Sequence, residues 1–117
     1  MRVLGFSKRW QKLSFSEFST FRFPRKDKDW SVGEEVQIVY KPRSKEREVL
    51  GIAVIISKEP RYFFNPKEEV PNKQLMGHSE AKRDGFKDYY DMVVWLKQAY
   101  GERIYTEPMN KLTLRWL

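Results

Sequence analysis

The sequence predicts a small α+β domain with a curled antiparallel sheet of five to six short strands and two to three helices. Several short segments alternate apolar and polar residues or are continuously apolar, which is typical of strands. Glycine, proline and polar turns separate these segments. A longer segment, residues 89–100, instead repeats apolar residues at helical spacing. Because this helix lies between groups of strands, the strands and helices belong to one mixed fold.

Length and composition favour one folded domain that spans residues 1–117. The chain is 40% hydrophobic and 15% aromatic, which is well above the content of a disordered chain. It has no cysteine, and His78 is its single histidine. A disulfide framework, a thiolate zinc site and a cysteine nucleophile are therefore excluded, and we expect no metal and no cofactor.

The amino-terminal third is predicted to hold two short strands around a helical segment. Residues 3–6 form an apolar candidate strand, and residues 8–13 predict one or two helical turns. Residues 20–23 predict the second strand. It ends at Pro24, because proline cannot donate a hydrogen bond to a neighbouring strand.

The middle of the chain predicts a hairpin. Residues 35–41 alternate apolar and polar side chains, the polar segment 42–47 forms a turn, and residues 49–58 form the next strand. Apolar residues occur on both faces of this strand, so we expect it to be buried on both sides, with Gly51 allowing a bend.

The remaining elements are shorter, apart from one helix. Residues 61–64 predict a brief strand, and residues 65–77 are irregular, with prolines and a glycine. Residues 80–84 predict a short helix, and residues 89–100 the longest one. The alternation in residues 112–116 predicts a closing strand.

Positive charge is concentrated in the first two fifths of the chain. The net charge is +7, and residues 1–47 hold 12 basic and 6 acidic residues, whereas residues 48–117 hold 11 and 10. This asymmetry favours an anionic partner, most simply a nucleic-acid backbone. The alternative is that the basic residues only keep a small protein in solution.

A basic and aromatic surface is the candidate binding site. Cationic groups neutralise phosphates, and exposed aromatic rings stack on unpaired bases. The candidate nucleic-acid-binding residues are Thr20, Arg22, Arg25, Lys26, Lys28, Trp30, Lys41 and Arg43. The alternative for Trp30 is packing in the core, and for the cations a solvated face balanced by nearby acidic residues.

Other classes of site find no support in the sequence. Neither a Gly-x-Gly-x-x-Gly nor a phosphate-binding-loop pattern occurs. Residues 1–6 lack the apolar core of a signal peptide, and no apolar run approaches the roughly 18 residues of a membrane span. We therefore expect a cytoplasmic protein without a membrane partner.

Two short motifs flank the basic loop: Thr20-Phe21-Arg22 precedes it and Gly33-Glu34-Glu35-Val36 follows it. They resemble the Thr-x-Arg element and the Gly-Asp-x-Val strand start of the ASCH domain, a family of the PUA-like superfamily of small RNA-associated barrels. Residues 51–55 resemble its Gly-x-Ala strand, and residues 80–86 the helix that ends in an acidic residue, glycine and phenylalanine. The resemblance covers most of the chain.

This resemblance implies a PUA-like barrel with a cleft between sheet and helices, and with Thr20, Arg22 and Asp84 at its mouth. It also implies a role around RNA or a modified nucleoside. Some members are amidohydrolases that deacylate acetylated cytidine with a lysine three residues before the threonine, the threonine itself and a helical glutamate. Glu17 and Asp84 take the lysine and glutamate positions here, and Glu17 reverses the charge that would stabilise an oxyanion.

Two main hypotheses follow for the function. The first is an RNA-binding module in which Thr20 and Arg22 hold a phosphate or base edge and the basic loop that follows adds salt-dependent affinity. The second is a hydrolase acting on a modified nucleoside or on RNA, with Glu17, Thr20 and Asp84 in its site. A third possibility is a protein-interaction domain that uses the aromatic patch at residues 62–64.

Overall fold

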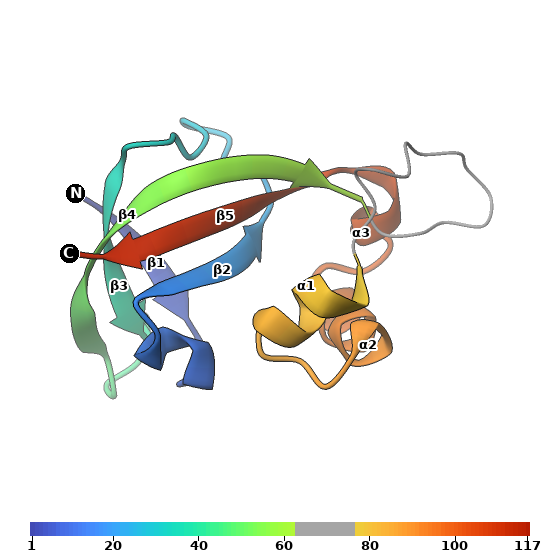
Figure 1. The fold of residues 1–117 in the computed structure, drawn as a ribbon, viewed down its shortest axis with the longest axis horizontal. Coiled ribbons are helices and arrows are strands. Elements are labelled where there is room, and N and C mark those ends of the chain that lie inside the picture. The colour runs from blue at the N-terminus through green and yellow to red at the C-terminus, as the bar shows by residue number, and fades with distance from the viewer. Residues whose placement is uncertain (63–76) are drawn as a thin grey trace.

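Strands and helices gather at opposite ends of the computed structural model, which describes residues 1–62 and 77–117 (Figure 1). Both termini lie at the strand end. The elements, in chain order, are β1 (Arg2–Phe6), the 3-10 helix η1 (Gln11–Ser14), β2 (Glu17–Arg22), β3 (Glu35–Tyr40), β4 (Glu48–Arg61), α1 (His78–Arg83), α2 (Tyr89–Tyr100), α3 (Arg103–Thr106) and β5 (Met109–Trp116). The predicted α+β class is confirmed.

The five strands of the described residues form one mixed sheet in the order β1-β3-β4-β5-β2. Strands β3, β4, β5 and β2 pair in antiparallel fashion, but β1 pairs with β3 in parallel, with Arg2 opposite Val36 and Phe6 opposite Tyr40. The prediction of a wholly antiparallel sheet is therefore wrong. A parallel pair needs a long connection, and residues 7–34, which include β2, supply it.

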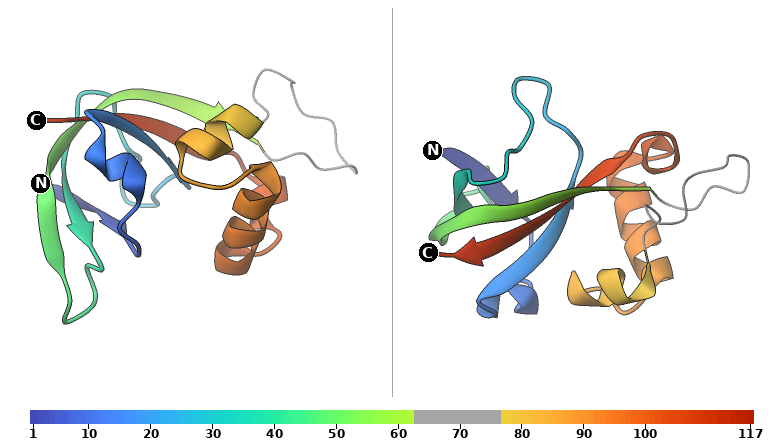
Figure 2. Two further views of the ribbon diagram at one scale, coloured as in Figure 1. Left: turned by 60° about the horizontal axis from the view of Figure 1, so that its bottom comes forward. Right: turned by 45° about the horizontal axis from the view of Figure 1, so that its top comes forward.

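The sheet is curled but open (Figure 2). Strands β1 and β2 are its two edges, and within the described residues they do not pair with each other. The closed barrel expected from the sequence is thus not seen in this part of the chain. Both views of Figure 2 place η1 next to α1, beside the edge strand β2.

Strand β4 is longer than predicted because it pairs with two partners. Its first half pairs with β3, and most of its length pairs with β5, with a bulge between Ile55 and Ser57. Only one face of β4 is buried. Ala53 and Ile55 are fully covered, whereas Ile52 is 39% exposed, so the expected burial on both faces is wrong.

The described residues contain two hydrophobic clusters, and Trp10 packs against both. The first lies on the inner face of the sheet and includes Leu4, Phe6, Phe18, Trp30, Val36, Ile38, Ala53, Ile55, Leu112 and Leu114. The second joins the helices to β2 and β5 and includes Phe21, Ala81, Phe86, Met92, Leu96, Ile104 and Met109. Trp10 thus lies where the two clusters adjoin.

The helices agree in part with the sequence. Helix α2 has the predicted bounds, and the Asp88 side chain caps it by accepting a hydrogen bond from the Asp91 amide at 2.8 Å. Helix α3 was not predicted, because four residues are too few for a helical period to emerge. Most of the predicted strand 61–64, the irregular segment 65–77 and the aromatic patch 62–64 lie outside the described residues.

Candidate functional site

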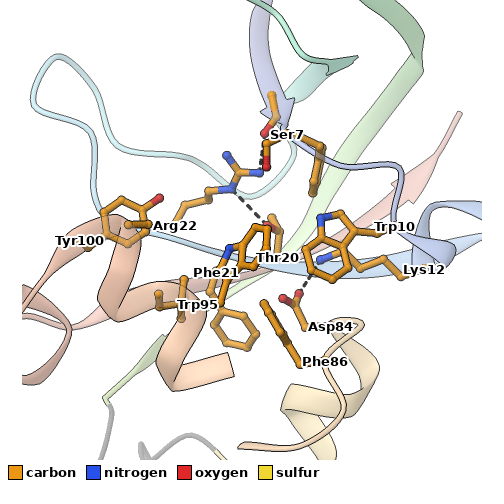
Figure 3. Close-up of a pocket in the computed structure, with 14 residues that line it drawn as sticks. Ser7, Trp10, Lys12, Thr20, Phe21, Arg22, Asp84, Phe86, Trp95 and Tyr100 are labelled. Carbon is orange, nitrogen blue, oxygen red and sulfur yellow. Dashed lines mark hydrogen bonds and ion pairs between the residues drawn. The ribbon is translucent and has the colours of Figure 1, made fainter. Parts of the chain in front are cut away.

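A cavity of about 320 Å³ opens where the two hydrophobic clusters meet (Figure 3). Its lining comes from the end of β1, from η1 and β2, from the α1–α2 connection and from α2. Segments that lie far apart in the sequence therefore build one pocket. Aromatic side chains form its walls, and ionisable groups lie at its base.

Three rings form one wall of the pocket. The centroid of Trp10 lies 5.0 Å from that of Phe86 and 5.5 Å from that of Trp95. A glycine makes this packing possible, because a Cβ on Gly85 would lie 2.7 Å from the Trp10 ring, and Gly85 has a φ of +108°. Trp95 lines the pocket and is 41% exposed, so this aromatic wall is in part accessible to solvent.

A buried ion pair lies at the base of the pocket. Lys12 of η1 donates through Nζ to Oδ1 of Asp84, which follows α1, at 2.6 Å, and their side chains are 4% and 7% exposed. Burial raises the pKa of Asp84 to about 6, although the Lys12 charge opposes this shift. Burial likewise lowers the pKa of Lys12, against the attraction of Asp84. The carboxyl group can therefore exchange a proton near neutral pH.

Thr20 and Arg22 lie on the same face of β2 and reach the same cavity. Arg22 donates through Nε to Oγ1 of Thr20 at 3.1 Å and through Nη2 to the Gly5 carbonyl at 2.7 Å. Gly5 belongs to the opposite edge strand, so this guanidinium spans the open side of the sheet. The two side chains predicted to act together do meet, with Asp84 in the same cavity (Figure 3).

Glu17 does not join this group. It is exposed and lines a different cavity with Ser19, because residues 17 and 19 face away from Thr20 on the alternating strand. The predicted arrangement of Glu17, Thr20 and Asp84 is therefore wrong. The cation beside Asp84 is Lys12, which sequence reasoning missed, since one lysine in a short helical turn gives no sign of burial.

The basic loop of Arg25, Lys26 and Lys28 is exposed, and none of its residues lines the pocket. The Lys28 carbonyl accepts a hydrogen bond from Arg2, at the start of β1, whereas the pocket lies at the other end of that strand. The two ends of a five-residue strand are about 13 Å apart. The loop and the pocket are therefore separate features of the surface.

Trp30 lies in the core instead of on the binding surface. It is 4% exposed, and the Arg2 guanidinium covers its ring at 4.4 Å from the centroid. The prediction that Trp30 stacks on a base is therefore wrong. Lys41 and Arg43, by contrast, line a groove that adjoins the pocket and shares Arg22 with it.

Comparisons with protein-family models, with curated proteins and with solved structures found no match to this chain. Among the described residues, no group of three or more histidine, cysteine or acidic side chains is arranged to hold a metal ion. No helix in residues 1–62 or 77–117 is long and apolar enough to cross a membrane.

Proposed function

We propose that this chain is an RNA-binding module with a PUA-like ASCH fold, which takes an unpaired base or a modified nucleotide into the pocket beside Trp10. The observation that carries the proposal is the combination of aromatic walls with four polar groups, from Lys12, Thr20, Arg22 and Asp84, in one cavity. A volume of about 320 Å³ is in the range of small-molecule sites.

The pocket offers what base recognition requires. Stacking of a base on an aromatic ring contributes roughly 1–3 kcal/mol and is available to every base, because each has a π face. Lys12 and Arg22 can donate to the acceptors of a base edge, and Thr20 can donate or accept. Asp84 accepts when ionised and donates when protonated, so its pKa near 6 makes its hydrogen bonding dependent on pH.

The ASCH assignment is part of this proposal. The resemblance implies that a threonine, an arginine and a helical acid meet in a cleft between sheet and helices, and the common cavity of Thr20, Arg22 and Asp84 supports that expectation. In this proposal, the exposed cations Arg25 and Lys26 add only long-range attraction to the phosphate backbone.

The test compares two neighbouring residues of α2. Trp95 lines the pocket, whereas Val94 is 56% exposed and does not. Trp95→Ala should weaken binding of short homopolymeric oligoribonucleotides and nucleoside monophosphates about tenfold by calorimetry, from loss of stacking. Val94→Ala should leave affinity unchanged. The proposal would be rejected if the wild-type protein bound none of these ligands. It would also be rejected if the two substitutions lowered the affinity equally.

A second candidate function is hydrolysis of an acylated nucleoside, and the buried pair of Lys12 and Asp84 favours it. The Thr20 hydroxyl would attack the acyl carbon and pass its proton to the Asp84 carboxylate, while the Lys12 ammonium stabilises the oxyanion. Collapse of this intermediate would expel the amine, which takes the proton back from Asp84. Water would then hydrolyse the acyl-threonine and release the acid.

Thr20→Val separates the two functions, because it removes the hydroxyl at nearly constant volume. The assay uses N4-acetylcytidine as the substrate, and chromatography measures its conversion to cytidine. Turnover by the wild-type protein and its loss in Thr20→Val, with ligand binding retained, would support the enzyme. A flat progress curve for the wild-type protein would reject hydrolysis of this substrate and leave the binding function in place.

A further inference from the structure

We infer that the groove beside the pocket binds the phosphate attached to the bound base, so that the ligand is a nucleotide or a strand and not a free nucleoside. This inference rests on the proposed function. The groove has a volume of about 520 Å³ and is lined by Lys41, Arg43 and Ser44 of the β3–β4 turn, together with Arg22. The groove and the pocket share Gly5, Phe6, Ser7 and Arg22, so they are continuous.

The turn that forms the groove is held against the end of β1. The Lys41 amide donates to the Phe6 carbonyl at 2.8 Å. Pro42 packs so closely on Gly5 that a Cβ there would lie 2.6 Å from its Cγ. Lys41 has a φ of +44°, an uncommon conformation for a residue other than glycine. The cations of this turn are thus held beside the pocket at a conformational cost, as is common at binding sites.

Arg22 is the group that both spaces share. Its Nε and Nη2 are bonded to Thr20 and Gly5, which fix the plane of the guanidinium. The remaining nitrogen, Nη1, makes no hydrogen bond to a described residue, and Figure 3 shows it directed away from both partners. An arginine fixed in this way can donate to a phosphate oxygen with little further loss of side-chain entropy.

The other groups of the groove complete an anion site. Arg43 is exposed and forms no ion pair with the described residues. Lys41 pairs with Glu46 at 3.0 Å, but an exposed pair of this kind contributes little and can be exchanged for a phosphate. Three cations therefore line the groove, and Glu46, the partner of Lys41, does not. A pocket with aromatic walls that continues into a basic groove fits a ligand in which a sugar joins a base to a phosphate.

The test measures four ligands by calorimetry at 50 mM and 200 mM salt: a nucleoside, its 5′-monophosphate, its 3′-monophosphate and inorganic phosphate. We expect one of the monophosphates to bind at least tenfold more tightly than the nucleoside at low salt and to lose more affinity at high salt. The preferred isomer gives the direction in which a strand crosses the groove.

The matched variants are two double substitutions in the same turn. Lys41→Gln with Arg43→Gln should remove the tenfold preference for the monophosphate while nucleoside affinity stays constant. Lys45 and Arg47 do not line the groove, so the variant with Lys45→Gln and Arg47→Gln should keep the preference for the monophosphate. Arg43→Gln alone should lower the preference for the monophosphate, and it leaves Lys41, with its left-handed backbone conformation, in place. Thermal denaturation checks that each variant folds.

Three results would overturn the inference. They are a nucleoside that binds as tightly as both monophosphates, inorganic phosphate that binds as tightly as the nucleotide, or equal losses in the two double variants. In the first and third cases the wild-type protein still binds the base, so the proposed function survives. In the second case it survives only where the nucleoside also binds, because the base then contributes affinity of its own. Absence of binding by the nucleoside and both monophosphates alike would instead reject the proposed function, and this inference with it.

Discussion

The base of the pocket and the basic loop carry similar chemical groups in opposite environments. The loop places Arg25, Lys26 and Lys28 within four residues, but all three are exposed. At the base of the pocket, Lys12 and Asp84 come from segments 72 residues apart, and both side chains are buried. Charge density along the sequence therefore does not identify the site of strongest electrostatic interaction in this molecule; burial does.

The two regions also differ in what their charges cost. Exposed cations remain hydrated and screened by salt, so the charges of the loop carry almost no desolvation penalty in the free energy of folding. Burial of an ion pair carries a desolvation penalty that the mutual attraction of the charges does not always offset. A pair kept in a cavity at that cost is a stronger indication of function than an exposed cluster is.

The largest effect should come from breaking the buried pair. Lys12→Met leaves the Asp84 carboxylate without a partner, and we expect a loss of about 3–5 kcal/mol in the free energy of unfolding at pH 7. Urea denaturation measures it. The matched control is Lys26→Met on the loop, which should change stability by less than about 0.5 kcal/mol. Equal losses in the two variants would remove the contrast between the regions.

The second effect is a dependence of stability on pH. The pKa of Asp84 in the folded protein is about 6, above the usual 3.8 of an aspartate, so the folded state holds this proton more tightly than the unfolded state does. The stabilisation is fully present below pH 4 and is lost as the pH rises through 6, a change of about 3 kcal/mol. The difference in unfolding free energy between the wild-type protein and Asp84→Asn should therefore fall between pH 4 and 7.

Other carboxylates do not confuse this measurement. Hydrogen bonds and nearby cations hold the pKa values of Glu34 and Glu80 below their usual range, which gives pH dependence of the opposite sign. Both groups are present in the wild-type protein and in Asp84→Asn, so their contributions cancel in the difference. A difference that stays constant from pH 4 to 7 would mean that Asp84 titrates normally.

The local pattern of the sequence predicted those features that depend on a few neighbouring residues. The alternation of strands, the period of α2 and the shared face of Thr20 and Arg22 follow from backbone geometry alone. The parallel pairing of β1 and the burial of Lys12 and Trp30 could not be predicted this way, because each depends on a segment that packs against it from elsewhere in the chain. Glu17 entered the hydrolase hypothesis through the resemblance, which places it at the lysine position of the family, and no local pattern marks Lys12 as the cation that packs against Asp84.

The third effect concerns affinity and compares one arginine from each region. Arg22→Ala removes a fixed donor and also leaves the Gly5 carbonyl and the Thr20 hydroxyl without this partner. Hydrogen bonds from charged groups contribute roughly 1.5–3 kcal/mol, so binding of single-stranded RNA should weaken at least tenfold. Filter binding at two salt concentrations measures the change. Arg25→Ala should weaken binding no more than about twofold, and the reverse order would assign the site to the loop.

The smallest effect should come from the loop as a whole. Arg25→Gln, Lys26→Gln and Lys28→Gln combined should lower RNA affinity about two- to threefold at low salt, and the difference should largely disappear at 200 mM, because exposed charges are screened beyond about 8–10 Å. The slope of affinity against salt would fall, while the preference among ligands would stay constant. A loss as large as that of Arg22→Ala would mean that the RNA backbone lies along the loop. The density of charge in the sequence would then have marked the binding surface after all.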